Sequence, residues 1–150
     1  MKVVLQRVSE ASVRVDGQVV GQVGQGLLAL VGIGHGDSLE TVRWMVQKTS
    51  QLRIFEDDAG KMNRSVLDVG GGVLAISQFT LYADCRKGRR PAFTDAAAPD
   101  HAKQLYGQYV QLLGEAGVHE VQAGIFAADM KVSLVNDGPV TIILEQDPRD

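Results

Sequence analysis

Residues 26–33, GLLALVGI, contain the longest apolar run of this 150-residue chain, from Leu27 to Ile33. The run has the length of a β-strand, and its lack of polar side chains predicts a strand that is buried on both faces. It is far shorter than the ~20 apolar residues that a helix needs to cross a bilayer. We therefore expect a soluble domain built around a central strand, with no membrane partner.

Strand-like sequence continues on both sides of this run. Upstream, VVLQRV (3–8) is rich in β-branched residues, and SVRVDGQVVGQV (12–23) has Asp16-Gly17 between two alternating stretches. This pattern predicts a β-hairpin, because glycine tolerates positive φ. Downstream, Asn136-Asp137-Gly138-Pro139 predicts a turn. The downstream strands are expected at 52–55, 73–77, 119–123, 131–136 and 140–145.

Two helices are predicted between the strands. Apolar residues recur every three or four positions from Leu39 to Leu52, after a cap at Asp37 or Ser38. The second helix is expected from about Pro99, which suits a first helical position, to Gly117, which suits a C-terminal stop. Strand-rich ends with two main helices between them predict a sheet-dominated, layered α/β fold, although the strand order stays open.

No repeat or linker divides the chain, so we expect residues 1–150 to form a single domain. The sequence has no signal-peptide core and one cysteine, Cys85, which cannot form an internal disulfide. These features predict a cytoplasmic protein. The net charge of −3 argues against general attraction to polyanions such as DNA. Four clustered cations are either a solvated loop or a local contact with nucleic acid: Arg86, Lys87, Arg89 and Arg90.

The usual catalytic and cofactor-binding groups are missing from the sequence pattern. His35, His101 and His119 have no partner at metal-ligand spacing, so we expect no metal site. The glycines at 70–72 lack the Lys-Ser/Thr of a phosphate-binding loop, and they predict a turn. We therefore expect no organic cofactor. Cys85 is either a thiol activated by its cationic neighbours or a cysteine without a chemical role.

A polar group, Ser77-Gln78-Phe79-Thr80, follows the predicted strand 73–77. In an extended segment Ser77 and Phe79 would share one face, and Gln78 and Thr80 the other. The group is either part of an active site or a strand end whose hydroxyls satisfy backbone groups. A nucleophilic Ser77 or Thr80 would need a histidine brought close in space, and the sequence identifies none.

Seven segments, in order along the chain, resemble the D-aminoacyl-tRNA deacylase family, also called the D-tyrosyl-tRNA deacylase family. They are QRVSEASVRVDG, GLLALVGI, LRIFEDDAGKMNRSV, SQFTLYAD, KGRRPAF, FAADM and NDGPVT. The resemblance implies the family's barrel-like α/β fold. It also implies hydrolysis of the ester that joins a D-amino acid, or glycine on non-cognate tRNA, to the 3′ end of tRNA. The implied assembly is a homodimer with two active sites at its interface.

The resemblance also implies residue roles. Ser77, Gln78, Phe79 and Thr80 would form the pocket floor. Gly138-Pro139, joined by a cis peptide bond, would reach into the partner's site and read the chirality of the substrate. The remaining assignments are Phe126 and Met130 near the terminal adenosine, unless they only join the core, and Arg86, Lys87, Arg89 and Arg90 at the tRNA phosphates. Ala127 departs from the glycine usual in the family, which could narrow the pocket or exclude a positive φ.

Such a site needs no catalytic triad, because an aminoacyl ester is already activated and the ribose supplies a 2′-hydroxyl beside it. We expect the backbone amide of Phe79 or Thr80 to stabilise the oxyanion, with the Thr80 hydroxyl orienting water or substrate. Two other classes stay open. One is a general esterase with a Thr80 or Ser77 nucleophile, and the other is a non-catalytic module that binds RNA ends.

Overall fold

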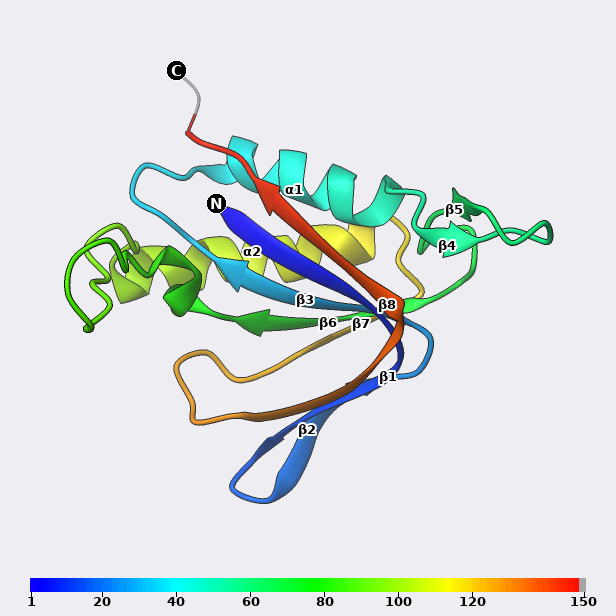
Figure 1. Ribbon diagram of the computed structural model, residues 1–150, viewed down its shortest axis with the longest axis horizontal. Coiled ribbons are helices and arrows are strands. Elements are labelled where there is room, and N and C mark those ends of the chain that lie inside the picture. The colour runs from blue at the N-terminus through cyan, green and yellow to red at the C-terminus, as the bar shows by residue number, and fades with distance from the viewer. Residues whose placement is uncertain (149–150) are drawn as a thin grey trace.

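The computed structural model describes residues 1–148, and its centre is one curved sheet (Figure 1). The long strand β1 pairs antiparallel with β2 and β3 along one edge and with β8 along the other. Strand β6 joins β3 in parallel, and β7 joins β6 in parallel. The strand bounds are β1 Lys2–Val15, β2 Gln18–Val23, β3 Gly26–Gly32, β6 Gly72–Ser77, β7 Glu120–Ala123 and β8 Lys131–Glu145.

The central strand β3 is buried on both faces, as its apolar run predicts. Leu27 and Val31 belong to the larger core under the helices, whereas Leu28 belongs to a second core with Leu74 and Ile76. A Cβ atom at Gly21 in β2 would lie 3.0 Å from the Ala123 carbonyl oxygen in β7, so the two ends of the sheet approach each other closely. The sheet therefore curls into a barrel-like form around the second core.

Helices α1 (Leu39–Gln51) and α2 (Pro99–Glu115) cover one face of the sheet (Figure 1). They pack on each other through buried apolar residues, and the hydroxyls of Thr49 and Tyr109 are hydrogen-bonded at 2.8 Å. Within residues 1–148, neither helix is both long and apolar enough to cross a membrane. The predicted layered α/β fold with two main helices is confirmed.

Local predictions in the first half of the chain were partly right. The Asp16-Gly17 hairpin is confirmed, with φ values of 50° and 78°. The strand predicted at 52–55 is wrong, because these residues mostly form the exit from α1: the Leu52 N–H still donates to Lys48, and the Ile54 N–H donates to Leu52. The observed strand β4 is Phe55–Glu56, and it forms a small hairpin with β5 (Met62–Arg64).

The turn predicted at residues 136–139 is wrong. Strand β8 runs on through this segment, and both of its halves pair with β1. The register passes from Gln6 opposite Thr141 to Val8 opposite Asn136, so the intervening residues of β8 form a bulge. Pairing with the whole length of β1 keeps the chain direction unchanged where the local sequence favours a reversal. The Gly138–Pro139 peptide bond in this bulge is cis.

Candidate active site

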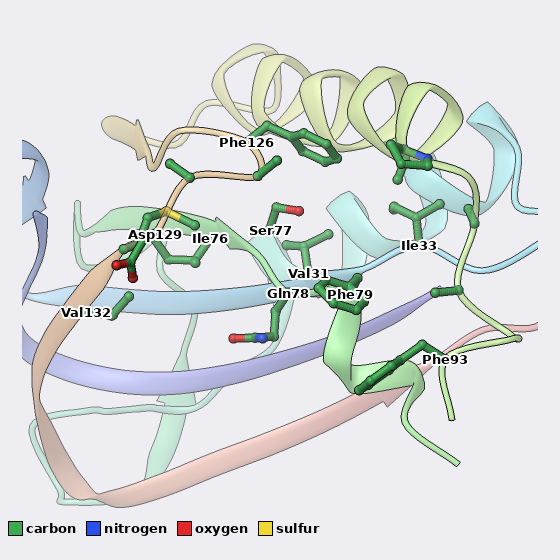
Figure 2. Close-up of a pocket in the computed structure, with 17 residues that line it drawn as sticks. Val31, Ile33, Ile76, Ser77, Gln78, Phe79, Phe93, Phe126, Asp129 and Val132 are labelled. Carbon is green, nitrogen blue, oxygen red and sulfur yellow. The ribbon is translucent and has the colours of Figure 1, made fainter. Parts of the chain in front are cut away.

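A cavity of about 550 Å³ opens where strands β3 and β6 end (Figure 2). Its floor comes from these strand ends, and its walls come from the segment before α2 and from the loop between β7 and β8. The lining is mostly apolar. It consists of Val31, Ile33, Ile76, Ser77, Gln78, Phe79, Phe93, Ala96, Ala97, Pro99, Ala102, Phe126, Ala127, Ala128, Asp129, Met130 and Val132.

The chain turns sharply at the cavity floor. The Gln78 N–H donates to the Val31 carbonyl at 2.7 Å, and the short 3₁₀ helix η1 (Phe79–Tyr82) begins at the next residue. Ser77 points toward Phe126 and Gln78 points the opposite way, so the alternation predicted for this pair is present (Figure 2). The extended form predicted for Phe79 and Thr80 is wrong, because the 3₁₀ turn places their backbone differently.

This turn leaves two backbone donors free. Within residues 1–148, neither the Phe79 N–H nor the Thr80 N–H donates to an acceptor. The first N–H groups of a helix have no partner inside the helix, and together they attract negative charge. The Thr80 hydroxyl accepts a hydrogen bond from the Gln78 side-chain amide, and its residue is exposed outside the cavity lining. Phe79 lines the cavity and Thr80 follows it, so these two main-chain donors lie at or beside the cavity floor.

Helix η1 is held in place from beneath by glycine and from the side by lysine. A Cβ at Gly34 would lie 2.7 Å from the Tyr82 ring, so the ring packs directly on this backbone. The Lys2 ammonium lies 4.8 Å from the centroid of the same ring and 3.5 Å from the Leu81 carbonyl oxygen. Burial raises the pKa of the Tyr82 hydroxyl. These contacts hold the end of η1 against β3 and the start of β1.

Phe126 and Met130, which the resemblance assigns to the terminal adenosine, both line the cavity. The Phe126 ring packs against Tyr106, with 6.2 Å between the ring centroids. The Tyr106 hydroxyl donates to the Ala75 carbonyl at 2.7 Å. Burial raises the pKa of this hydroxyl to about 12. This wall of the cavity is therefore fixed to the core of the molecule.

Histidine and metal chemistry have no obvious place at the cavity. His35 Nε2 lies 2.7 Å from the Thr94 carbonyl oxygen, and His101 Nε2 lies 2.8 Å from the Asp37 carbonyl oxygen. Neither they nor His119 belong to the lining. Among residues 1–148, no three His, Cys, Asp or Glu side chains are grouped so that they could hold a metal ion.

Comparison with known proteins identifies the family. The family described as D-Tyr-tRNA(Tyr) deacylase matches residues 4–145. The chain belongs to this family. Proteins named D-aminoacyl-tRNA deacylase from Rhodopirellula baltica and Thermomicrobium roseum are 66% and 59% identical to it over 145 residues. Each alignment covers 97% of this chain, with 99% and 94% of the relatives covered. The family resemblance found in the sequence is therefore confirmed.

Two solved structures have a fold similar to that of this chain. The structure described as c-Myc DNA Unwinding Element Binding Protein has a TM-score of 0.93 and 39% identity, covering 98% of this chain and 99% of its own. A probable eukaryotic D-amino acid tRNA deacylase has a TM-score of 0.82 at 17% identity, covering 95% and 97%, and shares the fold. The deacylase family fold thus extends over nearly the whole chain.

Of the two consequences expected for Ala127, the exclusion of a positive φ is wrong. Ala127 has a φ of 64° and lines the cavity. An alanine in the left-handed region costs roughly 1–2 kcal/mol. The loop therefore keeps a glycine-like backbone and adds one methyl group to the residue that stands at the cavity.

The four predicted cations lie outside the cavity lining, on a hairpin-like loop. Asp84 and Ala92 close this loop through two backbone hydrogen bonds of 2.7 and 2.9 Å. Arg86 makes side-chain hydrogen bonds of 2.9 and 2.8 Å to Asp84, which lower the pKa of that carboxyl to about 2. The other three cations are exposed and make no ion pair within residues 1–148. They are Lys87, Arg89 and Arg90.

Gly138 and Pro139 are exposed and lie away from the cavity of their own chain. Ser77 pairs with Val31, which pairs with Val3 of β1, whereas the β8 bulge begins opposite Val8. The bulge extends from the level of Val8 to that of Gln6, so three to five strand residues, about 10–17 Å, separate it along β1 from the level of Ser77. A single chain therefore does not bring this predicted motif to the cavity that contains SQFT.

The structure also reveals residues that the sequence patterns did not mark. Arg7 is buried, with its Nε donating to the Asp137 carbonyl and its Nη1 to the Ile54 carbonyl, both at 2.8 Å. An arginine within the alternating strand VVLQRV was the available signal, because a buried cation needs partners. Phe93 and Asp129 also line the cavity, and nothing in their local pattern distinguished them from ordinary loop residues.

Proposed function

We propose that this chain hydrolyses the ester bond between a D-amino acid and the terminal ribose of tRNA, releasing both products. The observation that carries the proposal is the cavity floor with two free amides, in a chain 54–66% identical to relatives named D-aminoacyl-tRNA deacylase. Glycine mischarged on non-cognate tRNA would be a second substrate. The product tRNA would leave with its 3′ end intact.

In the proposed mechanism, the amides of Phe79 and Thr80 stabilise the oxyanion that forms when water attacks the ester carbonyl. A single preorganised donor of this kind contributes ~10²–10³ in rate in other enzymes. The substrate's own 2′-hydroxyl assists the attack, so the mechanism needs no histidine in the cavity lining. The Thr80 hydroxyl, which accepts a hydrogen bond from the Gln78 side chain, orients water or substrate. It forms no covalent intermediate.

Chirality would be read by Gly138 and Pro139 of a second copy. Gly138 and Pro139 do not line the cavity of their own chain, and the bulge lies about 10–17 Å along β1 from the level of Ser77, which supports action on a partner's cavity. Arg7 holds the Asp137 carbonyl, so the backbone before Gly138 is fixed from behind. The main-chain carbonyls that flank Gly138-Pro139 would bind the substrate's amino group. The wall of the cavity would occupy the space that the side chain of an L-amino acid needs. Glycine has no side chain to block.

The homodimer needed for this arrangement would be twofold, because each chain then gives its bulge and receives the other's. Strand β8 supports such an interface: Val135 and Ile143 are 50% and 68% exposed on it. Large exposed apolar residues on a free strand edge favour pairing with another chain. Both sites of the dimer would be equivalent.

The 3′ end of tRNA would place its terminal adenosine against Phe126 and Met130. Its phosphates would lie near the loop of residues 84–92, which we call the basic loop. Lys87, Arg89 and Arg90 are exposed and available for phosphate, and Arg86 would contribute while bonded to Asp84. Since charged tRNA is made in the cytoplasm, we also propose a cytoplasmic location.

One assay separates this proposal from its rivals. Purified protein is incubated with D-Tyr-tRNA, L-Tyr-tRNA and a simple aryl ester, each with and without a chelator. We expect rapid loss of D-Tyr-tRNA alone, with no effect of the chelator. Cleavage of the aryl ester would indicate a general esterase, and binding of D-Tyr-tRNA without turnover would indicate a module that only binds RNA ends.

A further inference from the structure

Two exposed aromatic side chains lie together at the mouth of the cavity. Phe79 and Phe93 are 56% and 37% exposed, and their ring centroids are 5.1 Å apart in an edge-to-face arrangement (Figure 2). Both rings also line the cavity. Two large aromatic residues that share an exposed surface beside a cavity indicate a binding surface, in contrast to apolar residues exposed singly.

This pair lies between the cavity and the basic loop. Phe79 begins η1, and Phe93 directly follows Ala92, which pairs with Asp84 at the base of the loop. The far part of that loop carries the exposed cations Lys87, Arg89 and Arg90. Cavity, aromatic pair and cations thus follow one another along a single segment of chain. Single-stranded nucleic acid binds to this combination, because bases stack on aromatic rings while cations neutralise the phosphates.

We propose that Phe79 and Phe93 form a second nucleotide subsite, which stacks the base of the nucleotide that precedes the terminal adenosine. The inference rests on the proposed function, which places the terminal adenosine inside the cavity. The preceding nucleotide then emerges at the mouth, where the aromatic pair is exposed. Stacking tolerates every base, because each has a π-face, so the subsite recognises a single strand without reading its sequence.

The test compares two D-aminoacyl-tRNA substrates that differ only in whether the penultimate nucleotide carries its base. Wild-type protein should prefer the base-bearing substrate by about tenfold in kcat/KM, the lower part of the range that base stacking gives. Phe93→Ala should lose most of this preference, so that its kcat/KM values on the two substrates become nearly equal. Because the two changes remove the same contact, their effects should not add.

Two further variants guard against a trivial loss. Phe93→Trp offers a larger stacking surface and should restore the preference for the base-bearing substrate. Val19→Ala removes an exposed apolar side chain, 41% exposed, from strand β2, outside the cavity lining, and should leave the preference unchanged. Size-exclusion chromatography of Phe93→Ala reports whether Phe93 instead contacts a second copy, and a change in its oligomeric state would overturn the subsite.

The remaining outcomes separate the subsite from the activity. Wild-type protein that hydrolyses both substrates at equal rates overturns the subsite alone. Equal loss on both substrates in Phe93→Ala assigns Phe93 to the terminal adenosine and also overturns it. Wild-type protein that hydrolyses neither substrate overturns the proposed function and the subsite with it.

Discussion

The cavity and the β8 bulge differ in what a single chain provides for them. The cavity is lined by residues of both cores, among them Val31 of the larger core and Ile76 of the second. One of its walls is fixed through the hydrogen bond from Tyr106 to the Ala75 carbonyl. The bulge is held from behind by buried Arg7, yet Gly138 and Pro139 face solvent. The cavity does not contain the Gly138-Pro139 motif that would read chirality. The bulge contains this motif but has no cavity beside it in its own chain.

This difference supports the proposal that the two regions form one site only between two copies. If so, changes in the bulge should damage catalysis while leaving the fold of each chain intact. Changes beneath η1 should damage both. The predictions below follow this contrast, from the largest effect to the smallest.

Gly138→Ala should cause the largest loss, about 100-fold in kcat/KM for D-Tyr-tRNA, because misplacement of a positioning group by about 1 Å can cost this much. Gly138 has a φ of 149°, and an added Cβ would lie 2.8 Å from the Val140 N atom. Gln6→Ala, a half-buried neighbour across the β1–β8 ladder, serves as the control and should stay within a few-fold of wild type. Equal losses in the two variants would remove the special role of the bulge.

Gly34→Ala should lower the free energy of unfolding by about 1–3 kcal/mol, the usual cost of overpacking. Its Cβ would lie 2.7 Å from the Tyr82 ring, and η1 must shift to make room. Gly24→Ala is the matched control, since no atom lies within 4 Å of its added Cβ. In Gly34→Ala, the free energy of unfolding from denaturant melts and the deacylation rate should both fall. In Gly24→Ala, both should stay at the wild-type value. Unchanged activity in Gly34→Ala would show that η1 is not part of the catalytic floor.

Thr80→Ala should reduce kcat by less than about tenfold, because the proposed oxyanion donors are main-chain amides that the substitution leaves in place. Single-turnover deacylation of D-Tyr-tRNA measures the effect. Mass spectrometry of quenched reactions provides the opposing evidence. An acyl group trapped on Thr80 of the wild-type protein would replace this mechanism with nucleophilic catalysis.

Substitutions of the loop arginines should have the smallest effects. Arg89→Gln should reduce the magnitude of the slope of log affinity against log salt concentration by about 1, as for one lost phosphate contact. Arg86→Gln should change the slope less, because Asp84 already neutralises Arg86. Filter binding of tRNA at several salt concentrations measures both slopes. Identical slopes for wild type and Arg89→Gln would place the tRNA elsewhere.

The sequence predicts those features that depend on neighbours along the chain. The buried run of β3, the Asp16-Gly17 hairpin and the start of α2 at Pro99 follow from local pattern and turn chemistry. Ser77, Phe126 and Met130 were named as site residues through the resemblance, and the fold brings them to one cavity.

Other features depend on strand pairing between distant segments, which local patterns do not determine. Asn136 to Pro139 resemble a turn, but pairing of β8 with β1 turns them into a bulge. Arg7 acquires its partners only when Ile54, just before β4, and Asp137 in β8 lie beside it, about 50 and 130 positions later. Phe93 reaches the cavity because Asp84 pairs with Ala92. Each of these required knowledge of which distant segments meet.

Mixing two inactive variants tests the shared site most directly. One variant is Gly138→Ala, with an intact cavity, and the other is Ser77→Phe, whose larger side chain fills the cavity toward Phe126. Dimers refolded from an equal mixture should regain about a quarter of wild-type D-Tyr-tRNA deacylation, because half are mixed and each mixed dimer has one intact site. A mixture as inactive as its components would contradict a site that is built from two copies.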